Sequence, residues 1–421
     1  MHLVERHIIK QNNKLWKEMD LLSFLSKNIY NYANYLVRQK FIETTKQKEN
    51  GEVKHATYLN YYDIRRMVLK QIDYCSLPRK VSNQTLMLLD KNWKSFFKSI
   101  KDWKKNPYKY NGIPKLPNYK HKTKGRFVLI YELGAVSKKR LKNNIIKLSG
   151  TNIEIPYINY KEKLNQVRII PRSKSYIIEI IYEKSENVSK EINGRYCSID
   201  LGVNNLATIG SNILIPTIIN GKPLKSINQY YNKKRSKFKS KLGHYKNNKN
   251  EIKQYGTCNK IEKLTQKRNN KINDYLHKAS RYIINHLVSH NINTLVIGNN
   301  KKWKQEINIS NRNNQNFVNI PHSKFINMLV YKAKMEGINT IIMEESYTSK
   351  CSFLDNEMIE KHIKYKGRRI KRGLFKSKSG KLINADLNGS LNILRKAVPN
   401  IKFDNGIEVV AVSPKVFTLN N

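Results

Sequence analysis

Two aspartates lie where carboxylate chemistry is possible. Asp200 comes near the end of a strand-like run, residues 195–203, and Asp386 lies at the start of a helix-like run, residues 385–396. Ionised groups in a buried strand are costly unless they are paired or bound to a metal. Carboxylates that converge at one sheet edge raise one another's pKa unless a divalent cation neutralises them. The pair therefore predicts a site for Mg²⁺ or Mn²⁺, which prefer oxygen ligands.

Such a site is suited to phosphodiester hydrolysis. Two divalent ions about 4 Å apart can hold the attacking water and the leaving oxygen of a phosphodiester. Each aspartate alone also has a simpler explanation. Asp200 could be a turn residue at a strand end, and Asp386 could be a helix N-cap. Their combination within one fold is what favours catalysis.

The elements that carry these aspartates follow the order of an RNase H-like α/β layered sheet. Apolar and β-branched runs predict strands, and apolar residues at helical spacing predict helices. The expected order is three strands, a long basic helical stretch, a strand, a helix, a strand and a last helix. The ranges are 195–203, 206–210, 213–219, about 226–290, 294–297, 323–336, 340–344 and 385–396.

The first half of the chain has a different pattern. Residues 18–105 have apolar residues at helical spacing, and residues 106–124, with three prolines, form a loop or linker. Four β-branched and aromatic runs then predict a small β domain, which a strand at residues 4–10 could join. The helical region would be an insertion in that domain, which we expect to be β-barrel-like. The four runs are 127–131, 144–148, 167–170 and 176–182.

The net charge is strongly positive. The chain has 80 Lys and Arg against 31 Asp and Glu, a formal charge of +49. Such a field repels itself in a compact protein unless a polyanion compensates it, so we expect a nucleic-acid-binding protein. A solvated basic surface or an AT-rich gene is the alternative explanation, but AT-rich coding alone would not suppress Asp and Glu.

Three patches interleave cations with aromatic residues or glycine, which suits contacts to phosphates and stacking on unpaired bases. They carry no base-specific code. The candidate nucleic-acid-binding residues are Lys233, Lys234, Arg235, Lys237, Lys267, Arg268, Lys271, Arg368, Arg369, Lys371 and Arg372.

The compartment is predicted from what the sequence lacks. Its four cysteines form no C-x-x-C pair, which fits a reducing cytoplasm and gives no support for disulfides. No apolar run approaches the roughly 20 residues of a membrane span. Residues 1–10 lack the apolar core of a signal peptide. We expect a cytoplasmic protein without a membrane partner.

Four segments resemble the TnpB (OrfB) family of transposon-encoded, RNA-guided DNA nucleases, which are related to type V CRISPR effectors. The similarity is firm over residues 195–396 and loose before them. By this resemblance Asp200 is the first acid of a RuvC-like centre and Asp386 the third, and the partners are a guide RNA and target DNA in a prokaryotic cell. The segments are residues 198–208, 267–281, 345–350 and 385–393.

The resemblance also implies a domain plan. The β wedge domain would comprise residues 1–15 and 125–190, and the helical recognition domain with its linker residues 16–124. The RuvC-like nuclease domain would comprise residues 191–345 and 381–398. Residues 346–380 would be a degenerate zinc-ribbon-like insert that binds target nucleic acid, and residues 399–421 a C-terminal tail.

The sequence departs from the family at two places. The family's second acid, a Glu, normally ends the strand at residues 295–298, where this chain has Gly298. The family's four-cysteine zinc ribbon is reduced to Cys351. One cysteine with one histidine, His362, cannot hold tetrahedral zinc, so we expect no structural zinc.

We hypothesise that the missing acid comes from the adjoining strand. Parallel strands lie about 4.8 Å apart, so a carboxylate on the neighbouring strand stays within reach. Glu345 is the favoured residue and Glu344 the alternative, because one sequence does not define the register. A solvated acidic pair is the simpler explanation, and Glu306, in a polar loop, is a weaker substitute. The predicted catalytic and metal-holding set is Asp200, Glu345 or Glu344, and Asp386.

The main prediction is an RNA-guided, metal-dependent DNA endonuclease of a mobile element. One alternative is a nuclease-inactive RNA-guided DNA-binding repressor of the same family, which Gly298 favours. Another is a non-catalytic basic RNA-binding protein, which leaves Asp200 and Asp386 unexplained. Autonomous transposition is not expected, because no strand-joining nucleophile is evident.

Overall fold

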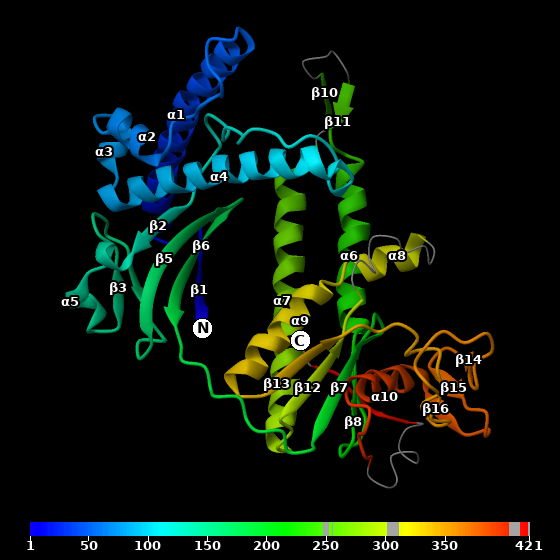
Figure 1. The fold of residues 1–421 in the computed structure, drawn as a ribbon. Helices are drawn as coiled ribbons and strands as arrows, with labels where there is room; N and C mark the ends of the chain where they lie inside the picture. Colours follow the sequence, from blue (N-terminus) through cyan, green and yellow to red (C-terminus); the bar gives the residue numbers. More distant parts are fainter. Residues whose placement is uncertain (247–251, 255, 301–310, 404–412, 420–421) are drawn as a thin grey trace. The chain divides into compact units, whose positions relative to one another are not determined.

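The structure, a computed structural model, describes residues 1–246, 252–254, 256–300, 311–403 and 413–419. The chain separates into two units, Met1–Ser185 and Glu186–Asn421, and each has its own sheet and hydrophobic core (Figure 1). None of the described helices is long and apolar enough to cross a membrane. The finer division into five domains stays a prediction.

The sheet of the first unit uses the beginning of the chain. β1 (His2–Lys10) pairs antiparallel with β6 (Ser175–Glu183), and β5 (Lys163–Arg172) and β2 (Leu129–Glu132) complete the order β1-β6-β5-β2. β3 (Ile145–Lys147) and β4 (Glu154–Pro156) form a separate pair. Among the described pairings β1 and β2 are edges, so the barrel-like closure stays a prediction.

The longer helices of this unit lie between β1 and β2 in the chain. The predicted range 18–105 consists of four helices, and three short helical turns follow later. Trp93 is fully buried and donates its indole N–H to Asn34 at 3.0 Å, which joins the two longest helices. The bounds are α1 (Trp16–Glu49), α2 (Tyr61–Val68), α3 (Ile72–Ser76), α4 (Arg79–Lys105), η1 (Pro107–Lys109), η2 (Leu133–Ala135) and α5 (Lys138–Leu141).

The second unit is built on a six-stranded sheet of order β13-β12-β7-β8-β9-β17. β7, β12 and β13 are parallel, whereas β8 runs antiparallel to both of its neighbours. The strands are β7 (Tyr196–Leu201), β8 (Asn205–Ser211), β9 (Thr217–Asn220), β12 (Thr294–Gly298), β13 (Asn339–Met343) and β17 (Lys415–Phe417).

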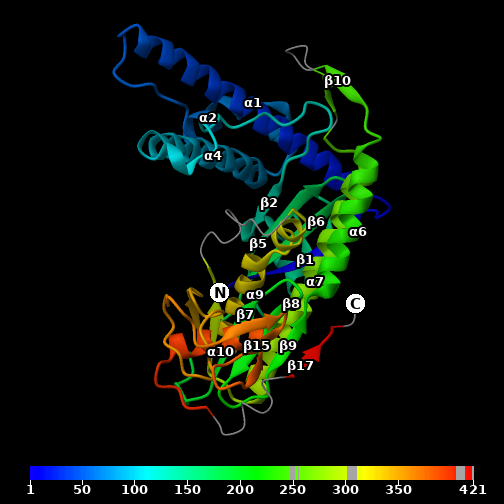
Figure 2. The ribbon, with the colours of Figure 1, turned by 90° about the vertical axis from the view of Figure 1, so that its right-hand side faces the viewer.

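Helices cover both faces of this sheet. Residues at alternate positions of β7 point to opposite sides. Cys197, Ile199 and Leu201 enter the core formed with α7 (Asn259–Ser289) and α9 (His322–Met335). Ser198 and Asp200 face α10 (Ala385–Ala397), as Val296 of β12 does. The helix α10 itself packs against β7 and β8 (Figure 2). The α10 face therefore carries the residues of interest.

The structure differs from the predicted elements in two respects. The helical stretch predicted at 226–290 is two helices, α6 (Lys222–Lys239) and α7, separated by the hairpin β10 (His244–Lys246) and β11 (Ile252–Gln254). Glycines at 243 and 256 border that hairpin, and glycine disfavours helix. β9 starts at Thr217 rather than 213, because Pro216 has no N–H for a ladder.

Elements that the sequence did not predict are short or isolated. A three-stranded sheet, β14 (Arg368–Lys371), β15 (Leu374–Lys376) and β16 (Leu382–Asn384), directly precedes α10. α8 (Asn311–Val318) lies in the stretch before α9. Strands of three or four residues give too few positions for a periodic pattern to show.

Candidate active site

Asp200 lies on the face of β7 that α10 covers. Its neighbour two residues earlier, Ser198, donates its hydroxyl to the Ser390 carbonyl at 2.7 Å and so holds strand and helix together. A Cβ added at Gly389 would lie 2.9 Å from Asp200 Oδ2. The glycine therefore lets α10 approach the strand closely enough for the helix backbone to contact the carboxylate.

Asp386 is the second residue of α10 and does not cap it. The cap is Asn384, whose side chain accepts hydrogen bonds from the Asp386 and Leu387 amides at 3.0 and 3.1 Å. The N-cap explanation for Asp386 is therefore wrong, because Asn384 already satisfies those amides. The Asp386 carboxylate instead accepts from Asn205 at 2.7 Å and from Arg369 at 3.3 Å.

The glycine at position 298 lies beside Asp200. Ile297 of β12 pairs with Ile199 of β7, so Gly298 and Asp200 are the next residues of two adjacent parallel strands. A Cβ at Gly298 would lie 2.8 Å from Glu345 Cγ and 2.6 Å from Ile393 Cδ1, and closer still to Glu345 Oε1. The carboxylate of Glu345 thus fills the space that a side chain at 298 would need.

Local backbone geometry directs Glu345 into that space. Gly298 pairs with Met343 on the parallel strand β13, and Glu345 follows two residues later. The Glu345 amide donates to Asn300 Oδ1 at 3.1 Å, and Asn300 Nδ2 donates to Glu345 Oε2 at 3.2 Å. This reciprocal pair clamps the segment after β13 against the segment after β12.

Burial and mutual repulsion shift the ionisation of these acids. Burial, with a smaller contribution from the Glu344 charge, raises the pKa of Glu345 to about 7. Burial, followed by the charges of Glu345 and Asp386, raises the pKa of Asp200 well above its ordinary value, and Arg369 opposes this. Glu345 Oε1 is buried without a hydrogen-bond donor. Such a group of acids is a place where a cation would be stabilised.

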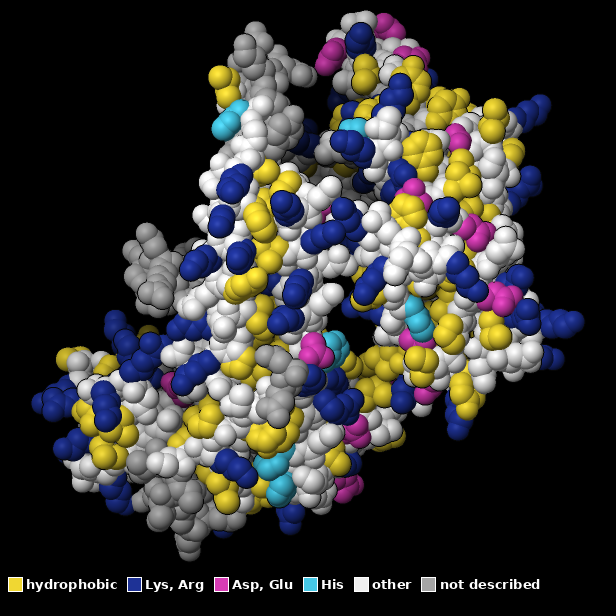
Figure 3. Space-filling model, turned by 180° about the vertical axis from the view of Figure 1, so that it is seen from behind, with side chains coloured by type: hydrophobic (Ala, Val, Ile, Leu, Met, Phe, Trp, Pro, Cys, Tyr) yellow, Lys and Arg dark blue, Asp and Glu magenta, His cyan; other side chains and the backbone are white. Residues whose placement is uncertain are grey.

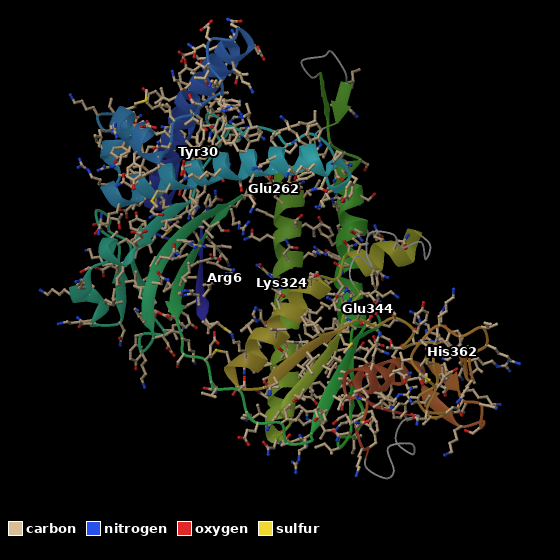
Figure 4. The ribbon with its side chains drawn as sticks, in the orientation of Figure 1. Arg6, Tyr30, Glu262, Lys324, Glu344 and His362 are labelled. Atoms are coloured by element: carbon tan, nitrogen blue, oxygen red, sulfur yellow. The ribbon has the colours of Figure 1, made fainter. Side chains whose placement is uncertain are left out.

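Glu344 points away from this group of acids. It is exposed and pairs with Lys396 at 3.2 Å, at the end of β13 (Figure 4). The hydrogen bond from Ser346 lowers the pKa of Glu344, burial opposes this, and Lys396 also lowers it. Of the two glutamates left open by the sequence, only Glu345 contacts the space at Gly298. The weaker substitute, Glu306, lies outside the described residues.

The carboxylates do not form a ready-made metal site. Within the described part of the chain, no three His, Cys, Asp or Glu side chains are grouped closely enough to hold a metal ion. Asp386 is occupied by Asn205 and Arg369 instead. The donor set still fits a divalent cation chemically, because it consists of carboxylate oxygens and one of them, Glu345 Oε1, is buried without a partner.

The segment expected to replace the zinc ribbon is held by carboxylates. Glu357, only 2% exposed, accepts from the Ser352 and Lys366 amides at 2.7 and 2.8 Å. Asp355 accepts from the Lys378 amide at 2.7 Å, which joins the loop to the far end of the insert. His362 is half-buried and contacts the Met358 carbonyl, and no group of three potential metal ligands among the described residues includes it with Cys351.

The predicted nucleic-acid-binding residues fall in three places. Four lie on α6, three on α7, and the last four on or directly after β14. Two of the arginines form hydrogen bonds or ion pairs with side chains that the sequence did not indicate. Arg369 pairs with Asp386, and Arg268 is half-buried and donates to the Asn228 side chain at 2.8 Å.

The sequence also missed Asn205 and Asn300. Asn205 immediately follows the turn after β7, and Asn300 follows β12 by two residues. The available signal for both residues was a polar side chain shortly after a strand that ends at the sheet edge where the acids lie. Ligands of α/β sheets bind at the carboxyl ends of strands.

The sheet order, with α10 on the acidic face and α7 and α9 on the other, defines a RuvC-like nuclease fold. Comparison with solved structures supports this class. A Cas12f1 protein, solved by cryo-EM in a complex with sgRNA and target DNA, superposes with a TM-score of 0.51 at 14% identity. That match covers 89% of this chain and 82% of the other.

Sequence comparisons find similar families and proteins. A family model described as "Probable transposase", OrfB_IS605, matches residues 179–304, and a Cas12f1-like TNB domain model matches residues 322–393. TnpB-like protein ORF457 of Acidianus two-tailed virus is 25% identical over 91% of this chain and 84% of its own length. TnpB-like protein MJ0751 of Methanocaldococcus jannaschii is 28% identical over 33% of this chain and 47% of its own length. The chain is therefore similar to TnpB-like proteins over most of its length, and two family models match parts of it.

Proposed function

We propose that the chain is an RNA-guided DNA endonuclease of a mobile element that hydrolyses phosphodiesters with divalent metal. The observation that carries the proposal is the Glu345 carboxylate in the space at Gly298, next to Asp200. It supplies the acid that the family has at position 298. The resemblance to TnpB-like proteins, and to a Cas12f1 solved with sgRNA and target DNA, supports a guide RNA and a target DNA as partners.

Three acids would hold the metal: Asp200, Glu345 and Asp386. When bound, Mg²⁺ or Mn²⁺ lowers the pKa of an attacking water and stabilises the leaving oxygen. The chain's own residues position these acids. Asn300 holds Glu345 through two hydrogen bonds, and Gly389 lets the α10 backbone lie against Asp200.

Arg369 has a place in the same mechanism. Its guanidinium lies 3.3 Å from Asp386 Oδ1, at the edge of the group of acids. Arginine binds carboxylates and phosphates with the same pairs of N–H groups. In the proposed enzyme the guanidinium exchanges Asp386 for a phosphate of the bound strand, which frees an Asp386 oxygen.

A second candidate function is a nuclease-inactive RNA-guided DNA-binding protein. The pairing of Asp386 with Arg369, and the lack of a ready-made three-residue metal group among the described residues, favour it. In that protein the acids would be structural, and the cations on α6, α7 and β14 would hold nucleic acid.

One experiment separates the two functions. The full chain is purified with its co-purifying RNA, the RNA is sequenced, and a plasmid with the matching target is incubated with protein and Mg²⁺. The endonuclease cuts the plasmid with the wild-type chain and not with Asp200→Asn, while both bind target in EDTA. Guide-directed binding without cleavage would establish the inactive protein instead. Random RNA fragments and no guide-directed binding would reject both functions.

A further inference from the structure

A cavity of about 510 Å³ opens between α6 and α7. The two helices lie side by side in Figures 1 and 2 and pack against each other. This volume is within the usual range for small-ligand sites, about 300–1,000 Å³. The lining residues come only from these two helices: Pro223, Ser226, Ile227, Tyr230, Tyr231, Leu264, Lys267, Arg268 and Lys271.

The lining has the chemistry of a nucleotide site. It includes three cations, two tyrosines and no acid. Figure 3 shows Lys and Arg side chains on both flanks of a hydrophobic stripe along these helices. Unpaired bases stack on aromatic rings, and the neighbouring phosphates bind cations. An acidic peptide would match the charge but would leave the tyrosine ring without a stacking partner.

The tyrosines have different roles. Tyr230 is 59% exposed, with the Lys234 ammonium 5.8 Å from the centre of its ring, so a large part of the ring is accessible. Tyr231 is fixed, because its hydroxyl shares a hydrogen bond with Thr265 at 3.0 Å and Arg268 lies 5.4 Å from its ring. Tyr230 is therefore the residue on which a base can stack.

The cations also have different roles. Arg268 donates one hydrogen bond to the Asn319 carbonyl and another to the Asn228 side chain, both at 2.8 Å. These bonds fix Arg268 as a wall of the cavity. Lys267 and Lys271 are exposed and have no carboxylate partner among the described residues. They are four residues apart on one helix, so they lie on the same face, one turn from each other. Two such ammonium groups can bind the phosphates on either side of one nucleotide.

We propose that this cavity binds one unpaired nucleotide of a single-stranded nucleic acid, with its base on Tyr230 and its phosphates on Lys267 and Lys271. The inference rests on the proposed function only in requiring that the chain bind nucleic acid. Cleavage is not needed, so the site is tested with EDTA present.

The test uses the full chain, freed of nucleic acid at high salt, and short single strands that contain 2-aminopurine. Stacking quenches the fluorescence of this base. Quenching is expected with the wild-type chain and with Tyr230→Phe, and its loss with Tyr230→Ala. Affinity should fall about 10-fold in Tyr230→Ala, since stacking contributes about 1–3 kcal/mol per base. RNA and DNA strands are run in parallel, and the one that binds more tightly is the natural source.

The lysines are tested by salt dependence. Lys267→Ala with Lys271→Ala should flatten the plot of log affinity against log salt by about 0.7 for each lost phosphate contact. Lys263→Ala is the matched control, because this exposed lysine is on the same helix, one turn before Lys267, and does not line the cavity.

Two results would overturn the inference while the proposed function stands. One is equal affinity of the wild-type chain for an intact strand and for one with an abasic position. The other is unchanged quenching in Tyr230→Ala. If the wild-type chain binds no nucleic acid at all, the proposed function fails as well.

Discussion

At position 298 a glycine leaves space that the Glu345 carboxylate fills, and in the proposed centre this carboxylate replaces an acid at 298. A side chain at position 298 would project from a rigid strand, whereas Glu345 reaches the same space from the loop after β13. That loop must turn sharply, and Tyr347 adopts a left-handed φ of 66° to do so. Because Glu345 lies beyond the end of β13, the two hydrogen bonds with Asn300 hold its position instead of the strand.

Gly298→Ala tests this exchange through packing. The added methyl group would lie 2.8 Å from Glu345 Cγ and 2.6 Å from Ile393 Cδ1, so both side chains must move. We expect a stability loss of about 1–3 kcal/mol and a loss of cleavage. Thermal unfolding and plasmid cleavage are the measurements.

Two further variants show whether the effect of Gly298→Ala comes from the clash with Glu345. Gly256→Ala is the control, because a Cβ there meets nothing within 4 Å. Adding Glu345→Ala to Gly298→Ala should recover part of the stability but none of the cleavage, since the two side chains compete for one space. Full cleavage by Gly298→Ala alone would contradict the arrangement.

At the scale of elements, α10 depends on small and polar residues where it meets the sheet. Ser198 and Ser390 share hydrogen bonds there, and Gly389 lets the helix backbone approach Asp200. The other face of the sheet packs against a mainly apolar core, in which α9 also buries a lysine. The two faces therefore have separate tasks: one supports the fold and the other holds the acids.

That lysine, Lys332, is 4% exposed and donates to the His277 carbonyl and to Ser280. Burial, helped by the charge of Arg281, lowers the pKa of Lys332 to about 8. The unfolded chain, with a pKa of about 10.4, therefore binds more protons between these two values, and stability rises with pH in that window. Lys332→Met should melt a few degrees higher at pH 7 and lose this rise. A variant that melts lower, with the same pH profile, would refute the explanation.

The insert between β13 and α10 should be stable without zinc. Glu357 accepts two backbone amides inside this segment, and glutamine would place an N–H against one of them. Glu357→Gln should lower the melting temperature, whereas the exposed Glu360→Gln should not. Chelators should leave the melting temperature of the wild-type chain unchanged. Stoichiometric zinc in the purified protein, with a chelator-induced loss of stability, would show that this explanation is wrong.

At the scale of the whole molecule, charge dominates. A formal charge of +49 implies many phosphate contacts. A protein with six to ten such contacts loses about 10³–10⁵ in affinity between 50 and 200 mM salt. We expect at least about a 10³-fold loss for guide RNA over this range, measured by filter binding or fluorescence anisotropy. A loss of less than tenfold would indicate that the charge is mainly a solvated surface.

Much of the second unit was predictable, because its strands and helices are long and strongly patterned. The positions of Asp200 and Asp386 followed from that pattern. The Asp386–Arg369 pair did not, since it depends on β14, an exposed four-residue strand. The choice between Glu344 and Glu345 also required the turn after β13, which one sequence does not define. The break between α6 and α7 was missed because basic helical patterning continues on both sides of it.

The central claim is that Glu345 replaces the acid missing at Gly298. The most direct measurement is single-turnover cleavage of a guide-matched plasmid in Mg²⁺ by Glu345→Gln and Glu344→Gln, each at equal target occupancy. We predict at least about a 10²-fold slower cleavage for Glu345→Gln, the order of effect of removing one charge-stabilising group, and near wild-type cleavage for Glu344→Gln. The control is that the wild-type chain cleaves and Asp200→Asn does not. If Glu345→Gln then cleaves as fast as the wild-type chain, the claim is contradicted.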